Sequence, residues 1–235
     1  MWRRRRSLML AIALVVGAVG LVIGGLGALL KHEPEFYIRP GCPDEFVASE
    51  QAARLITRVQ DLKNDIRLKP TWAGTLRADE LNSFFREHMA DGGGFAGALP
   101  AGCHDPRVAI DGDRLKFGVR YGRGIWSTVL WVELRAWLVK TEPNCLAVEL
   151  TAIRSGSIPV NSQAVLDAIT EAARDSNIDV SWYRTGGRPV GLFRFYADQL
   201  RPTTQILSFK IENGAIIVGG KSQVDPTVSG TEAVR

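Results

Sequence analysis

Alternation of apolar and polar residues over a long central stretch constrains the fold of this chain more than any other feature. From Val108 to Ala152, apolar residues recur at every second position, which is the period of a strand with one buried face. Asp111-Gly112-Asp113 and Glu142-Pro143-Asn144 interrupt the alternation with turn residues. The stretch predicts four sequential antiparallel strands near residues 108–110, 115–121, 125–139 and 146–152.

Helical spacing flanks this meander. Residues 46–66, 77–89 and 160–174 place apolar side chains three or four positions apart, as amphipathic helices do. Further strands are expected near 178–184, 190–196, 203–212 and 215–218, with Asn213-Gly214 as a hairpin turn. Because an apolar sheet face must be covered, we predict an α+β domain, a curved antiparallel sheet of about eight strands in two meanders packed on two or three helices.

An uncharged run from Ser7 to Leu30 follows four consecutive arginines. At about 1.5 Å per residue it would form a helix of roughly 36 Å, enough to cross a hydrocarbon core of about 30 Å. The positive-inside rule would keep the arginines cytoplasmic and the C-terminus outside. A cleaved secretory signal is the alternative, and it too would export residues 31–235. We predict an N-terminal transmembrane helix, with anchor residues Arg3, Arg4, Arg5, Arg6, Gly20 and Gly24.

The predicted organisation follows from this run. Residues 1–6 are a cytoplasmic basic segment, 7–30 the transmembrane anchor, 31–43 a stalk, 44–221 an extracytoplasmic domain and 222–235 a disordered tail. The chain has 29 Lys and Arg against 25 Asp and Glu, so the exported part is balanced once the four arginines are set aside. Nucleic acid is therefore not an expected partner. Membrane lipid, an apolar ligand and cell-envelope proteins are expected partners, at the cell membrane.

Motifs with catalytic or metal-binding spacing are not evident. Cys103-His104-Asp105 contains a nucleophile, a base and an acid, but adjacent side chains usually point apart, so we interpret it as a loop. Asp111 and Asp113 lack the further acidic ligands of a calcium loop. Cys42, Cys103 and Cys145 allow at most one internal disulfide. We expect a protein that is not an enzyme and that uses neither a metal nor a cofactor.

Aromatic residues gather on the predicted strands. Packing in the sheet core is one explanation for them. The other is that strand faces line a cavity or groove for an apolar ligand. The candidate ligand-binding residues are Trp126, Trp131, Trp137, Trp182, Phe193 and Phe195.

The segment Leu76-Arg77-Ala78-Asp79-Glu80-Leu81-Asn82-Ser83-Phe84-Phe85 carries one further signal. It resembles the L-[ST]-x-x-E-[LI]-N-x-[LFY] opening of small membrane-anchored bacterial families with tubular lipid-binding (TULIP-like) domains. The resemblance implies a curved sheet around a long helix, binding of an apolar ligand and no catalytic residue. The predicted function is a single-pass membrane-anchored extracytoplasmic domain that binds a lipid or other apolar ligand. The alternative is a non-catalytic protein-interaction or scaffolding subunit of a cell-envelope assembly.

Overall fold

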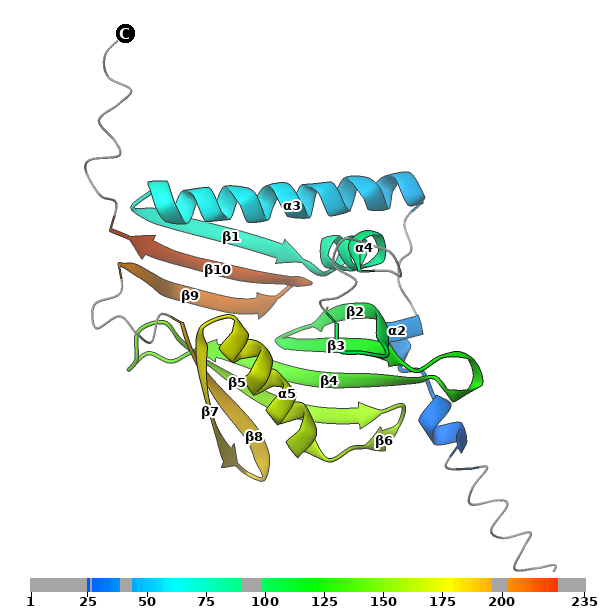
Figure 1. The fold of residues 1–235 in the computed structure, drawn as a ribbon. Coiled ribbons are helices and arrows are strands. Elements are labelled where there is room, and N and C mark those ends of the chain that lie inside the picture. The colour runs from blue at the N-terminus through cyan, green and yellow to red at the C-terminus, as the bar shows by residue number, and fades with distance from the viewer. Residues whose placement is uncertain (1–24, 26, 39–43, 90–98, 196–202, 224–235) are drawn as a thin grey trace, which may run out of the picture.

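The computed structural model describes residues 25, 27–38, 44–89, 99–195 and 203–223 (Figure 1). Its labelled α-helices are α2 (Glu35–Ile38), α3 (Glu45–Leu68), α4 (Ala78–His88) and α5 (Ser162–Asp175), and a short 3-10 helix spans Gly124–Trp126. Its strands are β1 (Thr71–Arg77), β2 (Cys103–Asp111), β3 (Arg114–Tyr121), β4 (Thr128–Leu138), β5 (Cys145–Ser155), β6 (Ile158–Pro159), β7 (Ile178–Thr185), β8 (Arg188–Phe195), β9 (Thr204–Glu212) and β10 (Ala215–Ser222).

These strands form two antiparallel sheets. The smaller sheet has the order β1-β10-β9, and the larger has the order β2-β3-β4-β5-β8-β7 with β6 beside β5. Helix α3 runs along the smaller sheet, and α5 lies across the β7–β8 hairpin (Figure 1). The predicted meander over 108–152 is present as β2 to β5, each strand paired with the next.

The prediction of one curved sheet in two meanders is wrong. The β7–β8 hairpin joins the first meander beside β5, whereas the β9–β10 hairpin belongs to the other sheet. Strand β1, which was not predicted, pairs with β10 from Thr71 opposite Lys221 to Arg77 opposite Ala215. Local periodicity does not report such a pairing, because its partners lie far apart in the sequence. More residues of the structure lie in strands than in helices.

The predicted transmembrane helix over residues 7–30 also needs correction. Among the described residues, no helix is both long and apolar enough to cross a membrane. Helix α3 has 24 residues but carries charged side chains along its length. Residues 7–24 and 26 of the predicted span lie outside the described residues, as do Arg3, Arg4, Arg5 and Arg6; Gly20 and Gly24 belong to that part of the span. The lack of a spanning helix among the described residues conflicts with the predicted membrane, transmembrane-helix and signal-anchor descriptions.

The described part of the predicted stalk lies against the larger sheet. Glu33 forms an ion pair with Arg120 at 2.7 Å, and the Tyr37 hydroxyl donates to the carbonyl of Asp105 at 2.7 Å. Tyr37 is buried, and this desolvation raises the pKa of its hydroxyl. Residues 39–43 lie outside the described part, as do residues 224–235 of the predicted tail.

The Glu80-Leu81-Asn82 segment of α4 connects this helix to α3 and to the edge strand β2. Glu80 is 3% exposed and pairs with Arg58 of α3 at 3.0 Å. The Asn82 amide donates to the carbonyl of Val108 and accepts from its N–H, both at 2.8 Å. The Asn82 amide thus makes the two hydrogen bonds that a neighbouring strand would otherwise make with the edge strand β2. In the structure, both polar residues of the motif have partners within the fold.

Candidate functional site

A groove of about 510 Å³ lies between the smaller sheet and the β4–β5 pair of the larger one. One wall comes from the β2–β3 turn and from β4 and β5, and the other comes from the last half of β9. Apolar and charged side chains both line it. They are Asp113, Arg135, Ala136, Trp137, Glu149, Phe209, Lys210, Ile211 and Glu212.

Strand alternation places the main aromatic residue of this groove. Arg135 and Trp137 are two positions apart on β4 and so share one face, opposite Glu149 and Ala147 of β5. A bulge between Glu133 and Leu134 shifts the register of this pair before the groove begins. Trp137 remains 43% exposed although it lies on a central strand. The indole of Trp137 is therefore accessible to a ligand in the groove.

Asn144 ties together the two sheets that form the groove, although it does not line the groove itself. It occupies the β4–β5 turn with a φ of 54°, a left-handed conformation that asparagine tolerates better than most residues. Its side chain is 1% exposed, donates to the carbonyl of Thr204 at 2.8 Å and accepts from the N–H of Ile206 at 2.7 Å. Its own carbonyl accepts from the N–H of Phe195 at 2.9 Å. One buried amide therefore ties the β4–β5 turn to the edge of β9.

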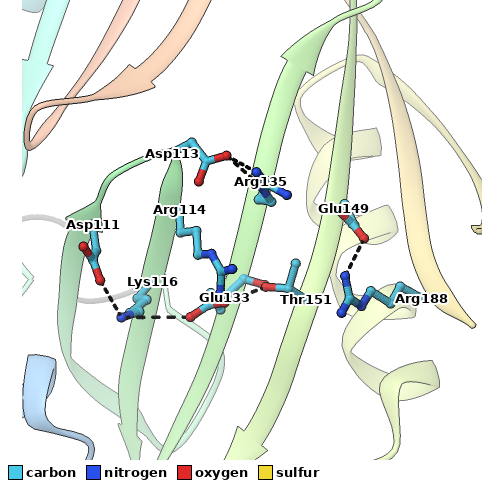
Figure 2. A network of polar contacts seen from close by, with 9 residues as sticks. All are labelled: Asp111, Asp113, Arg114, Lys116, Glu133, Arg135, Glu149, Thr151 and Arg188. Atoms are coloured by element: carbon cyan, nitrogen blue, oxygen red, sulfur yellow. Dashed lines mark hydrogen bonds and ion pairs between the residues drawn. The ribbon is translucent and has the colours of Figure 1, made fainter. Parts of the chain in front are cut away.

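Beside the groove, the same face of the larger sheet carries a network of charges (Figure 2). The Glu133 carboxylate accepts from Arg114 at 2.9 Å and from the Thr151 hydroxyl at 2.9 Å. Lys116 lies 4.0 Å from Glu133 and 3.4 Å from Asp111, so it bridges two carboxylates. These charged side chains pair with one another across β2, β3 and β4, and the Glu133 carboxylate has partners on β3 and β5.

Ion pairs also hold the charges at the rim of the groove. Asp113 accepts from two nitrogens of Arg135, with the Nε–Oδ2 distance 2.8 Å (Figure 2). The hydrogen bond from Arg135 lowers the pKa of Asp113, and the same bond raises the pKa of Arg135. Glu149 pairs with Arg188 of β8 at 3.2 Å. Within the described part of the chain, Lys210 on the other wall forms no ion pair and is exposed.

The six predicted ligand-binding aromatics do not converge on one site. Trp137 lines the groove, whereas Trp131 packs beneath α2, with its ring centroid 5.8 Å from that of Phe36. The Trp131 indole donates to the carbonyl of Gly156 at 2.8 Å, and Arg154 lies over the ring. Trp131 is therefore placed to hold α2 on the sheet.

Trp182 and Phe193 lie on the opposite face of the larger sheet. Their ring centroids are 6.0 Å apart, and the Trp182 indole donates to the Thr170 hydroxyl of α5 at 2.9 Å. Phe195 ends β8 opposite Ile178. Trp126 ends the 3-10 helix, and its side chain lies outside the description.

Sequence reasoning missed the second wall of the groove. Phe209 and Ile211 lie in a strand that was predicted, and their spacing of two places them on one face, but neither was singled out. Asn144 was interpreted only as a turn residue. An asparagine in a turn is a common signal, and its bonds to β9 depend on a contact between segments 60 residues apart.

The Cys103-His104-Asp105 sequence lies at the start of β2, where the pairing with β3 is irregular, and not in a loop. Both ring nitrogens of His104 have partners, Asp105 at 3.0 Å and the carbonyl of Gly122 at 2.9 Å. Burial raises the pKa of the Cys103 thiol, so the reactive thiolate is disfavoured. Among the residues that the structure describes, no three His, Cys, Asp or Glu side chains gather where they could hold a metal ion.

Comparison of the chain with known proteins identifies no relative. No protein-family model matches the chain, and neither the curated proteins nor the solved structures contain a match.

Proposed function

We propose that the domain binds an amphipathic small molecule in the groove between β9 and the β4–β5 pair. The observation that carries this proposal is the exposure of Trp137, 43%, in a groove that also contains Phe209 and Ile211. Large apolar side chains on a groove wall favour a ligand that can cover them, because covering apolar surface releases water. The ligand's apolar part lies against Trp137 and the half-buried Phe209, since Ile211 is only 6% exposed and has little surface left to cover.

The size of the groove supports a small ligand. Its volume of about 510 Å³ falls inside the range of roughly 300–1,000 Å³ typical of small-molecule sites. Tryptophan contributes a large contact area and one donor, so a single indole can anchor an apolar chain or ring and still meet a polar group. A ligand with one acyl chain or a small ring system fits this space better than a two-chain lipid.

The charges around the groove favour a zwitterionic or polar head group. Arg135 and Lys210 are opposed by Asp113, Glu149 and Glu212, which leaves a small negative excess. Arg135 is already engaged by Asp113, so Lys210 is the cation best placed to meet an anionic group. A head group that also carries a positive charge would be matched by Glu212 on the same strand.

Two further considerations bear on the proposal. The resemblance of residues 76–85 to TULIP-like domains implies binding of an apolar ligand and so supports it. The scaffolding role in a cell-envelope assembly and the extracytoplasmic location stay predictions, because the described residues do not distinguish them.

Photocrosslinking of the full chain tests the proposal with a local readout. The probe is a lysophosphatidylcholine that carries a diazirine on its acyl chain, used below its micellar concentration. We expect labelled peptides from residues 128–138 and 204–212. Because burial of a large apolar side chain is worth about 1.5–3 kcal/mol, Trp137→Ala should weaken labelling at these peptides roughly tenfold to hundredfold.

Tyr183→Ala provides the matched control. Tyr183 is also 43% exposed and lies on β7 of the same sheet, but it does not line the groove. The Tyr183→Ala chain should label as the unaltered chain does. Equal loss in both variants, or labelling confined to other peptides, would count against the groove as the ligand site.

A further inference from the structure

Exposed apolar side chains gather at one end of the larger sheet, away from the groove. Leu29 is 48% exposed, Leu30 39%, Tyr121 49% and Ile125 71%. We call these four residues the apolar tip. Leu29 and Leu30 belong to the helical residues 27–31, and the other two flank the connection from β3 to β4, which lies beside that helical turn in Figure 1.

Hydrogen bonds hold the two segments of the apolar tip together. The Thr128 hydroxyl donates to the carbonyl of Leu30 at 2.7 Å, and the N–H of Ser157 donates to the carbonyl of Leu29 at 2.9 Å. Gly156 makes this approach possible, since a Cβ there would overlap both leucine carbonyls. Its φ of 58° also favours glycine. The helical turn is therefore fixed to the sheet.

The β3–β4 connection is equally well held. The N–H of Gly122 donates to the carbonyl of Gly102 at 3.0 Å, and the N–H of Ser127 donates to the carbonyl of Gly124 at 3.2 Å. Ile125 lies between these bonds and is nevertheless 71% exposed. Ile125 is therefore exposed within an ordered turn, and together with Leu29, Leu30 and Tyr121 it forms the kind of exposed apolar group that marks an interaction site.

The charges next to the apolar tip suit a lipid head-group layer. Lys31, Arg123 and Arg154 are exposed there, with the acidic Glu35 and Asp105 nearby, so the local balance is slightly positive. Aliphatic side chains, an amphipathic tyrosine and flanking cations are the combination that proteins present to a bilayer interface.

We infer that the apolar tip rests on a phospholipid surface, with Leu29, Leu30 and Ile125 entering the boundary between head groups and acyl chains. In the sequence, Leu29 and Leu30 end the uncharged run that begins at Ser7, and this favours lipid over a protein partner. This contact is independent of ligand binding in the groove.

Hydrogen–deuterium exchange of the full chain, with and without phosphatidylcholine vesicles, tests the inference segment by segment. Vesicles should slow exchange several-fold in residues 121–127 and leave the β7–β8 hairpin, residues 178–188, unchanged. Ile125→Asp should remove the protection of 121–127 without changing the unfolding temperature. Leu207→Asp is the control, because Leu207 is 56% exposed on β9, a strand that Figure 1 shows away from the β3–β4 connection.

Two results would overturn the inference. Protection of residues 27–31 without protection of 121–127 would show that the β3–β4 connection does not touch lipid. Slower exchange in 121–127 that depends on protein concentration and not on vesicles would assign the apolar tip to contact between copies of the chain. Loss of protection in Ile125→Asp together with its retention in Leu207→Asp would support the lipid contact.

Discussion

Replacing Asn144 with alanine should separate the two walls of the groove and destabilise the fold. The change removes the side-chain bonds to Thr204 and Ile206, which together are worth about 1–3 kcal/mol at roughly 0.5–1.5 kcal/mol each. Alanine must also adopt a φ of 54°, which costs about 1–2 kcal/mol for a residue with a Cβ. We therefore expect Asn144→Ala to lower the free energy of unfolding by about 2–5 kcal/mol.

Two variants divide this loss into its causes. Asn144→Gly removes the same bonds but tolerates the positive φ, so it should cost about 1–2 kcal/mol less than the alanine variant. Asn177→Ala is the matched control, because exposed Asn177 has a φ of 55° and no side-chain bond within the described part of the chain. Urea unfolding of the full chain measures all three free energies. If Asn144→Ala costs no more than Asn177→Ala, the amide does not tie the sheets together.

Three further predictions concern other parts of the fold. Asn82→Ala should cost about 1–3 kcal/mol in urea unfolding, since it leaves the N–H and carbonyl of Val108 without their partner; an unchanged midpoint would refute the edge-capping role. Gly220→Ala should lower the unfolding temperature because its Cβ would overlap the ring of Trp72, and calorimetry that shows no decrease would contradict this packing. Burial raises the pKa of the Cys145 thiol from 9.0 to about 11, so iodoacetamide should modify it slowly at pH 8 in the folded chain. As the pH rises, the Cys145 thiol of the unfolded chain loses its proton at a lower pH than the thiol of the folded chain, so the free energy of unfolding should fall between pH 9 and 11. Fast alkylation of Cys145 in the folded chain, or a free energy of unfolding that rises over this range, would contradict the prediction.

Local patterns predicted the parts of the fold that depend on neighbouring residues. The alternation from Val108 to Ala152 identified the meander, and Asn213-Gly214 identified the β9–β10 hairpin. The division into two sheets depends on β1 meeting β10 and on the β7–β8 hairpin meeting β5. Neither contact has a local signature, and β1 itself was missed because Gly74 interrupts the apolar face that Trp72 and Leu76 share.

The candidate site was predicted only on one wall. Trp137 was among the candidate ligand-binding residues because aromatic side chains on a strand with an apolar opposite face are conspicuous. In the sequence, Phe209 and Ile211 look like ordinary strand residues, because only the structure shows that β9 faces β4 across the groove. Asn144 read as a turn residue because its bonds reach a strand about 60 positions later.

Native mass spectrometry of the full chain, before and after denaturation, tests most directly whether the groove is a ligand site. The proposal predicts a retained amphiphile of defined mass on the unaltered chain and on Tyr183→Ala. It predicts loss of most of this species from Trp137→Ala. A bare-chain mass for the unaltered protein, or the same retained species on all three chains, would contradict the proposed function.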